Sequence, residues 1–187
     1  VDLDLFTPKL SFKDKKSLLK KDLKMRIIYV GAGSYRKGYD RLSKLSNIIK
    51  DFASIIHVGS ILDFTKECNL RHSSRIKNIG VIKQDKLPNF YRESDVFVFP
   101  TREDGFGLVL SQAAASGLAL VSTSKCGIYD VIPEETHKES IVEAEDEDMI
   151  IEEFKEKLLD LHLNPDKRIK FGISNNKYSK ENHSWKK

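Results

Sequence analysis

Short apolar runs that alternate with helical patterns constrain the fold of this chain more than any other feature of its sequence. The apolar runs occupy residues 25–31, 53–59, 76–82, 95–100, 118–123 and 140–142. Helical patterns fall at residues 42–49, 87–93, 107–116, 148–163 and 166–178. Apolar runs of this length are typical of strands buried on both faces. We therefore predict an α/β fold with an open, mostly parallel sheet and helices on both faces.

Composition excludes several classes of protein. A hydrophobic fraction of 40% over 187 residues excludes a wholly disordered chain. A charged fraction of 32%, with no long unbroken apolar run, excludes a membrane-spanning helix. Lysine-rich residues 9–24, acidic residues 134–160 and basic residues 167–187 could mark contact with nucleic acid or a membrane. Solvated helix faces are the preferred interpretation, because no aromatic residues are interleaved with the cations.

The two cysteines, Cys68 and Cys126, are far apart and form neither a disulfide framework nor a zinc motif. They fit a reducing, cytoplasmic setting, with at most peripheral contact with the inner face of a membrane. The five histidines show no metal-ligand spacing. The chain opens on Val1 without a signal-peptide pattern, and we expect it to be a fragment of a longer protein.

The first candidate loop follows the strand at residues 25–31. In open parallel sheets, ligands bind beyond the carboxyl ends of the strands. Here Gly31 and Gly33 are followed by Arg36 and Lys37 at the start of a helix, a place that favours an anion. The loop is neither a Walker phosphate loop nor a complete dinucleotide fingerprint. A plain strand-to-helix turn with solvated cations remains the alternative.

The second candidate loop follows the strand at residues 95–100. Two carboxylates, Glu103 and Asp104, precede Gly105-Phe106-Gly107, and a helix then begins. Glycines allow close approach of a ligand, and the helix start offers free N–H groups. Asp104 and Gln112 are eight positions apart, so a polyol or ribose along this face could contact both. Alternatively, the carboxylates merely stabilise the helix N-terminus.

Several segments together resemble a known family. They are Lys37-Gly38, residues 87–96, Pro100-Thr101, residues 104–108 and Gly117. The pattern resembles the C-terminal domain of family 4 retaining glycosyltransferases, which have the two-domain GT-B fold. The resemblance implies a Rossmann-like, nucleotide-sugar-binding domain at residues 25–187. Residues 1–24 resemble an interdomain linker or edge segment, and Ser184-Trp185 resembles the start of a crossing helix. An N-terminal acceptor domain is then absent from this chain.

The resemblance also implies roles for individual residues. Lys37, with Arg36, would bind the diphosphate of a nucleotide-sugar donor, and Asp104 would contact the donor sugar. Gln112 would hold the ribose hydroxyls. Backbone amides of Leu108 and Val109 would meet the distal phosphate, and backbone near Val81 and Ile82 would face the base. The remaining donor-binding positions are Gly33, Gly105, Phe106 and Gly107. No metal or other cofactor is expected, and no nucleic-acid partner.

The function implied is donor binding in a retaining glycosyltransferase that transfers sugar to a saccharide or lipid-linked acceptor in surface polysaccharide or glycoconjugate synthesis. The isolated chain would bind donor but transfer little. Three positions depart from the family: Ala32 replaces a frequent arginine, and Asp104 and Gln112 replace two glutamates. These departures motivate an alternative, a non-catalytic nucleotide-sugar sensor or scaffold. A sugar-nucleotide epimerase is a third option.

Overall fold

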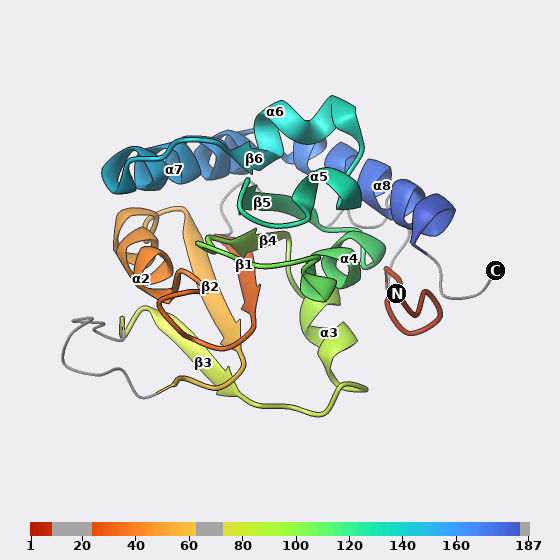
Figure 1. The fold of residues 1–187 in the computed structure, drawn as a ribbon, viewed down its shortest axis with the longest axis horizontal. Coiled ribbons are helices and arrows are strands. Elements are labelled where there is room, and N and C mark those ends of the chain that lie inside the picture. Colours follow the sequence, from red (N-terminus) through yellow and green to blue (C-terminus); the bar gives the residue numbers. More distant parts are fainter. Residues whose placement is uncertain (9–23, 63–72, 184–187) are drawn as a thin grey trace.

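A single parallel sheet organises the fold, seen in a computed structural model that describes residues 1–8, 24–62 and 73–183. The six described strands lie in the order β3-β2-β1-β4-β5-β6, and each neighbouring pair is parallel (Figure 1). Their bounds are β1 Met25–Val30, β2 Ala53–Val58, β3 Ile76–Gly80, β4 Val96–Phe99, β5 Ala119–Thr123 and β6 Ile141–Val142. The predicted open parallel sheet is confirmed.

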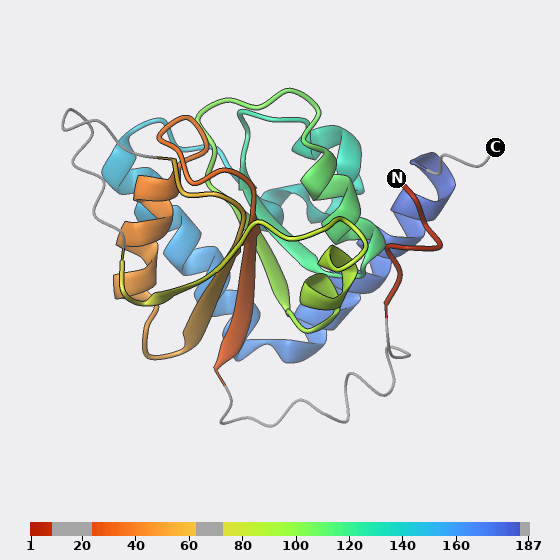
Figure 2. The ribbon, with the colours of Figure 1, turned by 90° about the horizontal axis from the view of Figure 1, so that it is seen from below.

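Helices cover both faces of this sheet. On one face lie α2 (Tyr39–Ile48) and α7 (Glu147–Leu163), and on the other lie α3 (Leu87–Arg92), α4 (Leu108–Ala115) and α8 (Pro165–Asn182) (Figures 1 and 2). Opposite faces are expected, because β1 leads to β2 in one direction along the sheet and β4 leads to β5 in the other. Right-handed crossovers then place α2 and α4 on opposite sides. The Rossmann-like class is therefore observed.

The helix boundaries follow from local sequence signals. The Asp146 side chain accepts hydrogen bonds from the backbone N–H groups of Asp148 and Met149, and so caps the start of α7. The break between α7 and α8 comes at Asn164, and Pro165 opens α8. Between β5 and β6 the chain forms α5 (Ile128–Val131), a 3-10 turn η2 (Glu134–Thr136) and α6 (His137–Ser140). The periodic patterns of the sequence predicted none of these three short elements.

The core lies between the sheet and its helices. All residues of β4 and β5 are buried, as are the alanines Ala113, Ala114 and Ala115 on α4. Helix α8 packs closely on the α4–β5 junction, where a side chain at Gly172 would meet the backbone oxygen of Gly117 at 2.3 Å. The buried Asn175 side chain donates to the Leu118 carbonyl at 2.9 Å. These contacts fix the helix whose start, at Leu108, borders the candidate site.

The first eight residues pack onto the domain. Phe6 is buried and its ring meets that of Tyr91 edge-on, with centroids 5.9 Å apart. The Val1 ammonium donates to the His183 carbonyl at 2.6 Å. Some features predicted from the sequence lie outside the described residues: the lysine-rich stretch from residue 9 to residue 23, Cys68 and Ser184-Trp185. No helix in the described ranges is both long and apolar enough to span a membrane.

Candidate functional site

The candidate site lies where the strand order of the sheet reverses. From β1 the chain proceeds to β2 and β3 on one side, and from β4 it proceeds to β5 and β6 on the other. Ligands of open α/β sheets bind at such a reversal, beyond the carboxyl ends of the strands. The first loop, residues 31–38, leaves the end of β1 at this place, and the second loop, residues 100–107, leaves the end of β4. They are the two loops singled out from the sequence.

The two loops contact each other through their backbones. Gly38 has a φ of 70°, and a Cβ atom there would lie 1.8 Å from the carbonyl oxygen of Pro100. The Arg36 carbonyl accepts hydrogen bonds from the Thr101 hydroxyl at 3.2 Å and from the Arg102 N–H at 2.9 Å. Only glycine can occupy position 38 without moving the second loop. This close packing fixes the separation of the side chains that the loops carry.

Lys37 and Asp104, the two principal residues predicted from the sequence, are in direct contact. The Lys37 ammonium lies 2.5 Å from a carboxylate oxygen of Asp104. The two side chains are 14% and 21% exposed, so the pair is partly buried yet open to solvent. The ammonium also lies 5.7 Å from the centre of the Phe99 ring, at the end of β4. The structure therefore brings one cation and one carboxylate together at the strand-order reversal.

Arg36 lies beside this pair but contacts backbone. Its guanidinium donates to the carbonyl of Glu103 at 3.2 Å, and both side chains are exposed. Asp104 is positioned through its own backbone, because its N–H donates to the Lys125 carbonyl at 3.0 Å. The Gly127 N–H likewise donates to the Gly105 carbonyl at 3.0 Å. The loop after β5 thus holds the second loop from the side opposite to the first loop.

The start of α4 presents the other predicted residues of the second loop. Gly107, with a φ of 67°, immediately precedes the helix, and the side chains of Phe106 and Leu108 are 47% and 56% exposed. Phe106 lies close to His183, with ring centroids 5.8 Å apart. Gln112 lies further along α4, where its side-chain oxygen accepts a hydrogen bond from the Tyr91 hydroxyl at 3.3 Å. That hydroxyl also lies 3.3 Å from the carbonyl oxygen of Val109.

The remaining predicted residues lie to the other side of the first loop. Gly33 is buried, and its N–H donates to the Ser60 carbonyl at 2.7 Å, so this N–H is already engaged within the protein. Val81 and Ile82 follow β3 at the outer edge of the sheet, where Val81 is 77% exposed and Ile82 is half-buried. The Gly59 N–H donates to the Gly80 carbonyl at 3.0 Å. This bond connects the end of β3 to the end of β2.

A buried aromatic cluster supports the first loop from below. The Tyr29 hydroxyl donates to the Ala32 carbonyl at 2.9 Å and lies 3.4 Å from the Lys37 carbonyl. Burial raises the pKa of Tyr29, so the hydroxyl keeps its proton and remains a donor. His57 packs against the rings of Tyr29 and Tyr39, and its Nε2 lies 2.8 Å from the Gly31 carbonyl oxygen. His57 is fully buried, and these contacts are those of a histidine packed in the core.

An ion-pair network around Arg102 was missed by sequence reasoning. The Arg102 guanidinium lies 3.6 Å from the Tyr35 ring centre and binds both carboxylate oxygens of Asp40 at 2.7 Å. It also donates to Glu147 at 3.1 Å, and Glu147 accepts two hydrogen bonds from Arg41 at 3.0 and 2.6 Å. Hydrogen bonds from Arg41 lower the pKa of Glu147. The network ties the second loop to α2 and α7, but its members are scattered in the sequence and share no motif.

The arrangement can hold an anion beside a hydroxyl-rich group. The Lys37 ammonium and the N–H groups at the start of α4 attract negative charge. The Asp104 carboxylate accepts hydrogen bonds from hydroxyls. Among the residues that the structure describes, no three His, Cys, Asp or Glu side chains gather where they could hold a metal ion. A ligand with a phosphate linkage and a polyol matches these groups best.

Comparisons with known proteins bear on the family and the fold of the chain. Residues 11–177 match the family described as glycosyl transferases group 1. An uncharacterized glycosyltransferase of Methanocaldococcus jannaschii is 27% identical over 144 residues, which cover 71% of this chain and 36% of that protein. This chain therefore spans well under half of that relative's length.

Two solved structures show the same fold. The C-terminal domain of the glycosyl transferase group 1 protein LpcC from Francisella tularensis has a TM-score of 0.75 at 22% identity, with all of both chains covered. Anabaena HepE in complex with UDP-glucose has a TM-score of 0.72 at 15% identity, covering 98% of this chain and 52% of that one. At these identities the likeness concerns the fold alone. Because the family match spans most of the sequence, the chain belongs to the glycosyl transferases group 1 family.

Proposed function

We propose that this chain is the donor-binding domain of a retaining glycosyltransferase. The enzyme would move a sugar from a nucleotide-sugar to a saccharide or lipid-linked acceptor in the synthesis of surface polysaccharides or glycoconjugates. The observation that carries the proposal is the contact of Lys37 with Asp104 at the strand-order reversal, the place where open α/β sheets bind ligands. Membership of the family and the UDP-glucose complex of HepE support a nucleotide-sugar as the ligand.

The proposed chemistry concerns the leaving nucleoside diphosphate. When the bond between the anomeric carbon and the phosphate oxygen breaks, negative charge builds on the diphosphate. The Lys37 ammonium, assisted by Arg36, stabilises that charge more strongly in the transition state than in the ground state. Asp104 orients the sugar while positive charge grows at the anomeric carbon. No metal is needed for these steps.

The surrounding groups complete the proposed donor site. Backbone N–H groups of Leu108 and Val109, at the start of α4, bind the distal phosphate. Gln112 holds the ribose hydroxyls, which requires it to release or share the hydrogen bond from Tyr91. The base lies toward the backbone of Val81 and Ile82 at the end of β3. Gly33 contributes to this site through loop shape, since its N–H bonds Ser60.

The acceptor site is proposed to lie on a preceding domain of comparable size, joined through residues 1–24. The chain spans about half of HepE, whose crystal structure contains UDP-glucose. We accordingly propose that the isolated chain binds donor and transfers little, and that it acts in the cytoplasm. These statements concern the whole enzyme and are tested separately from donor binding.

Calorimetric titration of the chain with a panel of nucleoside diphosphates tests the proposal. We expect at least one diphosphate to bind, and Lys37→Ala to weaken it about tenfold through loss of a charge-assisted hydrogen bond. The control is Lys177→Ala, at an exposed lysine on α8. Its affinity should equal that of the unaltered chain. Absence of binding at millimolar ligand by a folded chain, or equal affinity after Lys37→Ala, would contradict the proposal.

The alternative is a nucleotide-sugar sensor without catalysis, suggested by Ala32, Asp104 and Gln112 standing where the family has other residues. The full-length protein discriminates between the two functions. Turnover of the donor by the native sequence would exclude a sensor. If only the variant with Asp104→Glu and Gln112→Glu turned over donor, the sensor function would be favoured.

A further inference from the structure

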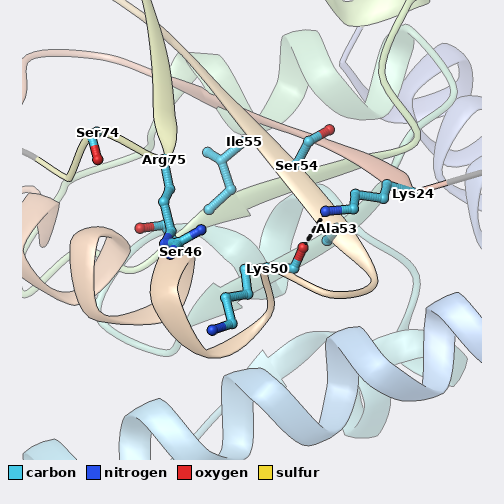
Figure 3. A pocket seen from close by; sticks show the side chains of 8 residues that line it. All are labelled: Lys24, Ser46, Lys50, Ala53, Ser54, Ile55, Ser74 and Arg75. Carbon is cyan, nitrogen blue, oxygen red and sulfur yellow. Dashed lines mark hydrogen bonds between the residues drawn. The ribbon is translucent and has the colours of Figure 1, made fainter.

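A hollow lies at the amino-terminal ends of the strands, whereas the proposed donor site lies at their carboxyl-terminal ends. It has a volume of about 370 Å³ and opens at the amino ends of β1, β2 and β3, beside the C-terminal end of α2 (Figure 3). Cationic and hydroxyl side chains dominate its lining: Lys24, Lys50, Arg75, Ser46, Ser54 and Ser74. None of these residues takes part in the donor site.

Two cations reach this hollow from opposite sides. Lys24, which immediately precedes β1, extends to the end of α2, where its ammonium donates to the Lys50 carbonyl at 2.5 Å (Figure 3). Arg75, which immediately precedes β3, comes down onto the same helix and donates from Nε to the Asn47 side-chain oxygen at 3.1 Å. Each cation is thus held in place by a neutral acceptor, and no carboxylate of the described residues pairs with either of them.

Carboxylates are missing from the described residues that line this hollow. Other arginines of the protein have them: Arg26 pairs with Asp95, and Arg102 pairs with Asp40. Like charges gathered without a counter-charge repel one another. An anion that enters the hollow relieves this repulsion, and the terminal nitrogens of the guanidinium match the geometry of phosphate oxygens.

The size and chemistry of the hollow narrow the class of ligand. Its volume lies at the lower end of the range of about 300–1,000 Å³ typical of small-molecule sites. Ser54 and Ser74 add exposed hydroxyl groups, which donate readily to phosphate oxygens. We propose that this hollow is a second anion site, which binds a phosphate-bearing group, supplied either by a small free phosphate compound or by the headgroup of an anionic lipid.

Nuclear magnetic resonance of the chain titrated with inorganic pyrophosphate tests the site. The Lys37→Ala background is used so that binding at the donor site is weakened and the second site is followed on its own. We expect the amide signals of Ser54 and Arg75 to shift on addition of pyrophosphate. Lys24→Gln combined with Arg75→Gln should weaken that binding by about tenfold or more, since two charge-assisted contacts are lost.

The matched control is Lys177→Gln, which removes one charge at an exposed position on α8 and should leave the shifts unchanged. Arg75→Lys keeps the charge but loses the planar fork, and we expect an intermediate affinity. The dispersion of the amide spectrum shows in each case that the variant is folded. Unchanged signals of Ser54 and Arg75 up to about 10 mM pyrophosphate would overturn the proposal of a free phosphate compound, because this concentration is far above the dissociation constant of a working site.

Sedimentation with vesicles separates the two sources of phosphate. Two kinds of vesicle are compared. One is phosphatidylcholine alone, and the other also contains about 20% phosphatidylglycerol, enough for a negative surface potential. Co-sedimentation that requires the anionic lipid, falls in the Lys24→Gln, Arg75→Gln chain and is competed by pyrophosphate supports a headgroup. Pyrophosphate binding without co-sedimentation supports a free phosphate compound. Failure of both, or vesicle binding unaffected by the two substitutions, overturns the site, whatever the outcome at Lys37.

Discussion

Gly38 is the residue on which the geometry of the candidate site most depends. It combines a left-handed backbone with a Cβ position occupied by the carbonyl oxygen of Pro100, 1.8 Å away. Any side chain there must push the two loops apart or distort both. The Lys37–Asp104 contact, one residue away on the first loop, would then be lost as well.

Gly38→Ala should therefore destabilise the chain by ~2 kcal/mol or more, from strain and overlap together. Gly105→Ala is the control, because Gly105 has no heavy atom within 4 Å of its Cβ position and no positive φ of this kind. Chemical denaturation of both variants measures the difference. Equal unfolding free energies for the two would show that the close approach at Gly38 has no energetic weight.

Asp104 has a second effect that follows from its contact with Lys37. Without ligand, the carboxylate occupies the ammonium that a diphosphate needs. Asp104→Asn removes this competition and a negative charge close to the diphosphate. We expect the affinity for a free nucleoside diphosphate to rise about three- to tenfold, an effect of roughly 1 kcal/mol.

The corresponding nucleotide-sugar should gain less, because the amide is a weaker acceptor for the sugar hydroxyls than a carboxylate. Parallel calorimetric titrations of both ligands give the two ratios. Weaker binding of the free diphosphate by Asp104→Asn would mean that the carboxylate assists the diphosphate, which our assignment does not allow.

At the scale of elements, β1 and β4 are clamped together by a charged pair at their amino ends. Asp95 accepts hydrogen bonds from the backbone N–H, Nε and Nη2 of Arg26, at 2.9, 3.0 and 2.9 Å. Burial by itself would raise the pKa of Asp95, but the hydrogen bonds and charge of Arg26 outweigh burial and hold it below its ordinary value. The two central strands are thereby joined at their amino-terminal ends, away from the donor site at their carboxyl-terminal ends.

This clamp predicts a dependence of stability on pH. Because the pKa is lower in the folded state, the stabilisation is complete above the ordinary Asp value of about 4 and is lost as the pH falls through the folded pKa. Asp95→Asn should cost ~1–2 kcal/mol at pH 7, since Arg26 is half exposed. Below about pH 4 the two chains should converge in unfolding free energy. A difference in unfolding free energy that stays constant from pH 7 to about pH 3, roughly one unit below the ordinary value, would contradict this account. The control is Asp51→Asn, at an exposed aspartate.

Elements of the sheet could be predicted because each leaves a local signal. The runs that become β1, β4 and β5 are mostly apolar, and glycine or proline follows β1 and β4. The positions of Lys37 and Asp104 at strand ends followed from the same signals. Helix α6 was missed because its four residues are too few to show a helical period.

Contacts between distant residues left no comparable signal. Arg102 meets Asp40 and Glu147 only after the fold brings three elements together. The hydrogen bond from the Gly33 N–H to the Ser60 carbonyl is likewise a tertiary contact, which the sequence does not reveal. The hollow between Lys24 and Arg75 forms where neighbouring strands begin. Which strands are neighbours is determined only by the order of the strands in the folded sheet.

At the scale of the whole molecule, the proposed donor site joins the two halves of the sheet. Lys37 belongs to the half formed by β1, β2 and β3, and Asp104 to the half formed by β4, β5 and β6. A ligand that contacts both halves should slow their opening together. Hydrogen exchange with saturating nucleoside diphosphate should protect residues 31–38 and 100–113 in concert, and α8 much less. Protection confined to one of these two segments would show that the ligand contacts only one half.

The backbone contacts between the two loops have a kinetic consequence. Gly38 rests on Pro100, and the Arg36 carbonyl is held by both Thr101 and Arg102, so neither loop can swing away without the other. Ligand entry would then require only that the Lys37 ammonium and the Asp104 carboxylate leave each other and contact the ligand. Such a change of side-chain rotamers takes place on the nanosecond scale. Association should proceed in one phase whose rate rises linearly with nucleotide concentration, as for a receptor whose shape exists before its ligand arrives.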